Sequence, residues 1–262
     1  APDATCRTDG TAQRCGDGIV DPGTGEQCEA TADCGSGFTC RACGCFTSFD
    51  FTVVPGPADP TLGPVCASAV GATREAKPCR IVAYYGTPAA PSMGILGRLP
   101  RPDMPASLAA DVRLWATADP TVTTRCAFEV ISIVAQRSAG PSGLYRARIG
   151  PVALNEIIAL ARANGCLTIL DLQVGQSSVP VELPYFLPWL AQPDVHLALD
   201  PEWDMPAGVV PGSRIGSMEA TDINSAIASM TQLVRERRLP PKLVIVHRFR
   251  DFMIVNPTEI RP

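Results

Sequence analysis

The stretch from Val195 to Trp203, V-H-L-A-L-D-P-E-W, is an apolar run that ends abruptly in two carboxylates separated by one proline. Such a run is typical of a buried strand whose end opens into a site. Residues two apart in a strand point to the same face, so Asp200 and Glu202 are expected to project together, with Trp203 beside them. Pro201 has no N–H for the ladder and marks where strand pairing stops.

Similar apolar runs recur along the chain and alternate with helical patterns. This alternation predicts βα units in a parallel sheet. The predicted strands cover residues 80–86, 127–135, 167–174, 195–203 and 243–248, and the predicted helices cover residues 106–118, 151–164, 180–190 and 222–238.

The expected fold is therefore α/β and TIM-barrel-like. A closed barrel typically needs about 250 residues, and the region from residue 79 to residue 262 is shorter than that. We expect a partial or truncated βα barrel, or a fragment of a longer product, in which residues 252–255 are a candidate for a sixth strand. Ligands bind at the carboxyl ends of the strands in such folds.

Cysteines divide the chain into regions. The chain has 11 cysteines, and most lie before residue 50 among small and polar residues that cannot build a core. Residues 1–50 are therefore predicted to be a small disulfide-rich module, residues 51–78 a linker rich in proline and glycine, and residues 79–262 the barrel-like domain. The spacing of Cys40 and Cys43 also allows zinc, although a zinc site usually needs a second pair of ligands.

Three later cysteines precede predicted strands. Cys79, Cys126 and Cys166 are expected to gather at the amino ends of the strands, away from the site, where neighbouring cysteines could form a disulfide. One cysteine of the chain must remain unpaired, because 11 is an odd number.

Charge and hydropathy limit the partners. The net charge of −4 and the pI near 5.3 give no basic surface for nucleic acid. No apolar run reaches the length of about 18 residues that spans a bilayer. Because many cysteines fit an oxidising compartment, we expect a secreted or cell-surface protein, with Ala1 as the start of a mature form.

Two resemblances support that location. The string C-G-D-G-I-V-D-P-G-T-G-E-Q-C, from Cys15 to Cys28, resembles the C-G-D-G-x-x-D-x-G-E-x-C repeat of secreted and surface proteins of myxobacterial type, which implies an extracellular or cell-surface setting. The strings A-Y-Y-G-T-P, S-M-G-I-L-G, I-L-D-L-Q-V-G and A-L-D-P-E-W resemble a family of secreted bacterial TIM-barrel-like proteins. That family implies a chain continuing beyond Met253, and it implies no particular activity.

Ionisable and aromatic residues recur at the ends of the predicted strands. Buried charge costs free energy unless it is paired, so this recurrence favours a functional site over a purely structural origin. The candidate catalytic residues are Glu202, Asp200 and Asp171, and the candidate substrate-binding residues are Tyr84, Tyr85, Glu129, Gln173, Trp203 and His247.

The first functional hypothesis is a glycoside hydrolase-like protein that acts on an extracellular polysaccharide and needs no cofactor. Two carboxylates are the groups that glycosidases use, and the D-x-E at the end of the strand is similar to the L-D-x-E of chitinases and of GH25-type lysozymes. On that analogy Glu202 is the general acid, with its pKa raised by Asp200. Tyr84, Tyr85 and Trp203 offer surfaces on which sugars stack.

Two alternatives remain open from the sequence. The first is a metal-dependent extracellular enzyme, because Asp171, Asp200, Glu202 and His247 are a set of ligands that suits a divalent ion. Its weakness is the single histidine, since His196 begins its strand and is expected to point to the opposite end. The second alternative is a surface binding module without catalysis.

Overall fold

The computed structural model describes residues 38–41, 44–47, 50–54, 79–88 and 90–261. In the first two of these ranges, strands β1 (Phe38–Arg41) and β2 (Gly44–Thr47) form an antiparallel pair. Most of the predicted cysteine-rich module and most of the predicted linker lie outside the described residues. Strand β3 (Asp50–Val54) spans the position at which the linker was expected to begin.

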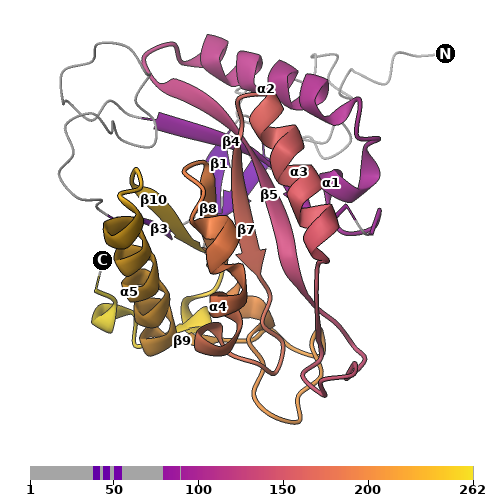
Figure 1. Cartoon of the computed structure of the whole chain (residues 1–262), viewed down its shortest axis with the longest axis vertical. Coiled ribbons are helices and arrows are strands. Elements are labelled where there is room, and N and C mark those ends of the chain that lie inside the picture. Colours follow the sequence, from indigo (N-terminus) through magenta and orange to yellow (C-terminus); the bar gives the residue numbers. More distant parts are fainter. Residues whose placement is uncertain (1–37, 42–43, 48–49, 55–78, 89, 262) are drawn as a thin grey trace, which may run out of the picture.

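The centre of the fold is a curled parallel sheet of five strands in the form of a half-barrel (Figure 1). These strands are β4 (Cys79–Gly86), β5 (Thr123–Ala135), β7 (Leu167–Leu172), β8 (Val195–Leu199) and β10 (Lys242–Val246). Each pairs in parallel with the next one along the chain. Strand β3 adds to β10 in the antiparallel direction, and the short β6 (Arg146–Arg148) adds to the end of β5.

Four helices follow the strands as the sequence predicts. They are α2 (Met104–Ala118), α3 (Pro151–Ala163), α4 (Val179–Leu190) and α5 (Ala220–Arg237). The short helix α1 (Ile95–Arg98), which follows β4, was not predicted. Helices α2, α3 and α4 each carry a proline in the first turn, where its missing N–H costs nothing. Gly165, at a φ of 68°, takes the left-handed conformation that ends α3.

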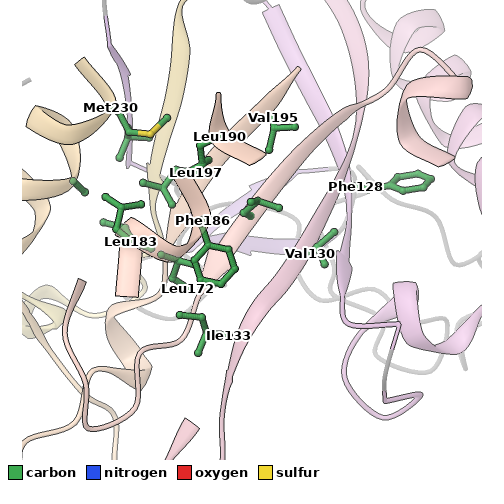
Figure 2. Packing of buried hydrophobic residues seen from close by; sticks show 14 of the residues in the cluster. Phe128, Val130, Ile133, Leu172, Leu183, Phe186, Leu190, Val195, Leu197 and Met230 are labelled. Atoms are coloured by element: carbon green, nitrogen blue, oxygen red, sulfur yellow. The ribbon is translucent and has the colours of Figure 1, made fainter. Parts of the chain in front are cut away.

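The two faces of the sheet differ. The outer face packs against the helices and holds the main core, in which Phe128 and Val130 of β5, Val195 and Leu197 of β8 and Phe186 of α4 are buried (Figure 2). The inner face carries a smaller apolar cluster, made of Ala127, Leu167, Ile169 and Ala198, with Ile81, Ala83 and Ile245 packed against it. The parallel strands therefore carry apolar residues on both faces of the sheet along most of their length.

The predicted sixth strand is not part of the sheet. Strand β11 (Ile254–Val255) pairs instead with β9 (Met218–Glu219) in a separate small sheet. Around it lie the 3₁₀ turns Asp251–Met253 and Pro257–Glu259. Asn224 of α5 holds this segment, because its side chain donates to the carbonyl of Glu259 and accepts from the amide of Arg261. The described residues thus form half of a barrel rather than a closed one.

The amino ends of the strands carry a disulfide. Cys126, near the start of β5, is bonded to Cys166, which immediately precedes β7, with the two Cα atoms 4.7 Å apart. Cys79, the first residue of β4, is also disulfide-bonded. The prediction that these three cysteines lie away from the carboxyl ends of the strands is confirmed.

Candidate active site at the carboxyl ends of the strands

At the carboxyl ends of the strands, polar residues follow the smaller apolar cluster of the inner face, which forms the floor of the candidate site. In each of the five parallel strands, a polar residue lies two positions after an apolar residue of the inner face. The pairs are Ala83 and Tyr85, Ala127 and Glu129, Ile169 and Asp171, Ala198 and Asp200, and Ile245 and His247. Because alternate residues share a face, the five polar side chains converge above the floor.

His247 lies at the centre of this group. Its Nε2 atom is 2.8 Å from Oε1 of Glu129, and its Nδ1 atom is 4.0 Å from Oδ1 of Asp200. The ring of Tyr85 meets the imidazole edge-on, with the ring centres 6.2 Å apart. His247 therefore joins β10 to β5 and β8 through its two nitrogens.

Gln173 links three parts of the site. It directly follows β7, and its amide nitrogen donates to the hydroxyl of Tyr85 over 3.2 Å and to Oδ2 of Asp200 over 3.3 Å. Its side-chain oxygen accepts from the backbone N–H of Ala135 over 3.1 Å. With its oxygen occupied by the backbone, the Gln173 amide has one orientation, and in that orientation it donates to Asp200.

Asp171 differs from its neighbours in lacking regular partners. Its side chain is fully buried, and neither carboxylate oxygen accepts a hydrogen bond of ordinary geometry. The Tyr85 hydroxyl is close enough to lower its pKa somewhat, although burial has the larger and opposite effect. A buried carboxylate oxygen without a donor is costly.

The charges of the site are strongly coupled. Burial raises the pKa of Asp171 to about 6, against the opposing effect of His247. Burial and the charge of Asp171 raise the pKa of Asp200 well above its usual range. Burial alone would lower the pKa of His247, but the bond to Glu129 and the surrounding carboxylates raise it to about 10. At neutral pH the imidazole is therefore cationic.

Glu202 is close to this group but does not project from a strand. The expectation that Asp200 and Glu202 share a strand face is wrong, because β8 ends at Leu199 and residues Pro201–Trp203 form a 3₁₀ turn. Glu202 and Trp203 are both half-buried. Burial is the main cause that raises the pKa of Glu202, while a hydrogen bond from Trp203 and the charge of His247 lower it.

Tyr84 is not part of the site. It belongs to the outer face, where its hydroxyl donates to Oδ2 of Asp111 in α2 over 2.7 Å. Burial, together with Asp111, raises the pKa of Tyr84 to about 12. Neighbouring residues in a strand point to opposite faces, so the inner position of Tyr85 excludes Tyr84.

Two glycines shape the edge of the site beside Tyr85. Gly86 and Gly94 form an isolated bridge that folds the loop after β4 back onto the end of that strand. Both have a positive φ, and a Cβ atom on either would lie 2.3 Å from a backbone oxygen. The loop at this edge therefore depends on these two glycines.

The predicted metal ligands meet only in part. Among the described residues, one group of possible ligands comes together, with donor atoms of Asp171, Asp200 and His247 all within 4.8 Å of one another. Glu202 is not part of that group. Sequence reasoning named all four residues but missed that Glu129 pairs with His247 rather than lining the site independently.

Comparisons with protein families, with curated proteins and with solved structures gave no match for this chain. A search of the described residues found no helix that is both long and apolar enough to cross a membrane. The site must therefore be interpreted from its own geometry.

Proposed function

We propose that the chain is a secreted or cell-surface hydrolase that cleaves glycosidic bonds of an extracellular polysaccharide. The observation that carries this proposal is the difference in burial between Glu202 and its neighbours Asp171 and Asp200. Glu202 is a half-buried carboxyl with a raised pKa, and it borders a buried pair, Asp171 and Asp200, whose pKa values are also raised. Several carboxyls set in different environments are what acid–base hydrolysis requires.

In this proposal Glu202 is the general acid. Its proton goes to the glycosidic oxygen as the bond from that oxygen to the anomeric carbon breaks. A water molecule forms the new bond to the anomeric carbon, and its proton passes to the buried pair of carboxylates. Glu202 suits the first role because it is more accessible than Asp171 or Asp200, which are 0% and 2% exposed.

Aromatic side chains beside the acids suit a sugar substrate. Trp203 directly follows Glu202 and is half-buried, so part of its surface is accessible. Tyr85 lies in the group itself, with its ring edge-on to that of His247. Aromatic rings and carboxyls together favour a neutral, hydroxyl-rich substrate over an anionic one, because the nearby carboxylates would repel an anion.

The extracellular location rests on cysteine chemistry. The Cys126–Cys166 disulfide and the disulfide-bonded Cys79 lie in the described residues, and seven further cysteines precede residue 50. Disulfides persist in oxidising compartments.

A screen of glycan substrates, carried out with the unchanged protein and with the Glu202→Gln variant, tests this proposal. Purified protein is incubated with peptidoglycan, chitin and plant glycans, and the release of reducing ends is measured. On any substrate that the protein cleaves, Glu202→Gln should reduce turnover by about 10²-fold to 10⁴-fold, because the amide has no transferable proton. Glu236→Gln, an exposed change on α5, serves as the matched control. Unchanged turnover in Glu202→Gln on a verified substrate would remove Glu202 from the mechanism.

A further inference from the structure

We propose that Asp171, Asp200 and His247 form a binding site for one divalent metal ion of the Zn²⁺ or Mn²⁺ class. Their donor atoms come from three neighbouring strands and all lie within 4.8 Å of one another. This site stands on its own geometry and does not depend on the proposed hydrolysis.

The spacing of the donors fits such an ion. In a tetrahedral site with ligand atoms about 2.1 Å from Zn²⁺, the ligand atoms are about 3.4 Å apart. The donor atoms of the three residues lie within 4.8 Å of one another, so side-chain movements of about an ångström would close them around an ion. Two carboxylate oxygens with one imidazole nitrogen suit Zn²⁺ or Mn²⁺, whereas Ca²⁺ prefers oxygen ligands alone.

Asp171 supplies the independent reason to expect a cation. Both of its oxygens are buried and accept no regular hydrogen bond. Burying a carboxylate without donors is unfavourable, and a metal ion is one of the few partners that can offset this cost. The Asp171 carboxylate belongs to the same group as Asp200 and His247, so one ion can contact all three.

The surrounding residues hold the other two ligands in orientation. Glu129 lies 2.8 Å from Nε2 of His247, which leaves Nδ1 on the side of Asp200. Gln173 donates to Oδ2 of Asp200, so Oδ1 remains on the side of His247. In metal sites, ligating histidines commonly donate their second N–H to a carboxylate, and ligating carboxylates are themselves hydrogen-bonded. The structure contains both arrangements.

Three protein ligands leave coordination positions for other groups. A site with three ligands and an open position is typical of ions that activate water or bind substrate oxygens. Glu202, outside the group of ligands, would keep its role as the acid.

Metal titration of the full chain tests the site. Protein treated with a chelator is titrated with Zn²⁺, Mn²⁺ or Ca²⁺ in a calorimeter. We expect one Zn²⁺ or Mn²⁺ per chain and weaker binding of Ca²⁺. Losing a partner of a ligand costs about 10-fold to 100-fold in affinity, so Asp171→Asn and His247→Gln, which remove a ligand itself, should each weaken binding by at least about 100-fold.

Two controls keep the outcomes separate. His196→Gln changes the other histidine and should leave the affinity unchanged, as should Glu236→Gln, an exposed change on α5. Circular dichroism shows whether each variant is folded, and His247→Gln provides a second test if Asp171→Asn does not fold. Absence of binding, or binding that survives both ligand variants, overturns the site. Metal binding without activity on any glycan leaves the site standing and counts against the proposed function alone.

Discussion

The two histidines of the chain lie at opposite ends of the same inner face and have opposite charge states. His196, at the amino end, is buried, and burial followed by the charges of Lys242 and Arg125 lowers its pKa to about 3. His247, at the carboxyl end, has its pKa raised to about 10 by Glu129 and the neighbouring aspartates, which outweigh burial. The neighbouring charges thus favour a neutral imidazole at one end and a cationic one at the other.

The two ends of the sheet therefore differ in kind. We call the amino end, around His196, the structural end, and the carboxyl end, around His247, the chemical end. At the amino end, His196 accepts a hydrogen bond from the backbone N–H of Leu243, and Lys242 donates to the carbonyls of Gln192 and Val195. These contacts fix the backbone of adjacent strands. At the carboxyl end, the polar side chains contact each other, and Asp171 has no regular hydrogen bond. That end is arranged to hold positive charge.

The largest expected effect comes from the disulfide at the structural end. It closes a loop with a sequence separation of 40, and constraint of the unfolded chain by a loop of this length stabilises the fold by about 4 kcal/mol. The double change Cys126→Ser, Cys166→Ser should lower the free energy of unfolding by about that amount, measured by urea denaturation under native redox conditions.

The same double variant also tests the separation of the two ends. While it remains folded, its affinity for Zn²⁺ should equal that of the unchanged protein. A large loss of affinity with only a small loss of stability would show that the two ends are coupled.

A second effect follows from the neutral state of His196. Its folded pKa of about 3 lies below the unfolded value of 6.5, so the unfolded chain binds the proton more readily between these values. The stability that His196 contributes is complete above pH 6.5 and is lost as the pH falls toward 3. Each pH unit corresponds to about 1.4 kcal/mol.

The His196→Gln variant isolates this effect, because glutamine retains an oxygen that can accept from Leu243 but does not titrate. Between pH 6.5 and pH 5, the unchanged protein should lose about 2 kcal/mol more stability than the variant. Parallel stability curves for the two proteins over this range would mean that His196 is protonated in the folded state.

The smallest effect concerns Glu129 at the chemical end. Glu129→Gln keeps the size of the side chain and an oxygen facing His247, but removes its negative charge. Zn²⁺ affinity should fall by about 10-fold, the lower end of the range for partners of metal ligands. Calorimetry measures this change, with the exposed Glu156→Gln on α3 as the control. An unchanged affinity would limit Glu129 to a role in the metal-free protein.

Sequence patterns predicted the elements of the sheet well because those patterns follow burial. Apolar runs located all five parallel strands, and proline and glycine located the ends of α3. The carboxyl ends of these strands also supplied the polar residues Tyr85, Glu129, Asp171, Asp200 and His247, each two positions beyond an apolar inner residue. Alternation is a local property of the strand, so a single sequence can reveal it.

What the sequence did not reveal depends on contacts between distant segments. Tyr84 and Tyr85 could not be separated before the two faces of the sheet were known. The pairing of Glu129 with His247 joins positions 118 residues apart. The strand pattern was extended through Pro201, although the chain turns there, and Glu202 therefore lies outside the strand. Residues 252–255 have an apolar pattern, but only Ile254 and Val255 form a strand, and that strand pairs with β9 instead of β10.

The order of the strands in the chain also predicts how the site is assembled during folding. In the five-stranded parallel sheet, each strand pairs with the next strand of that sheet along the chain, and short loops close at a lower entropic cost than long ones. If the strands pair in chain order, Glu129, Asp171 and Asp200 meet before β10 adds His247. The positive charge of His247 would then favour docking of β10 beside these carboxylates. Completion of the parallel sheet would then coincide with completion of the site.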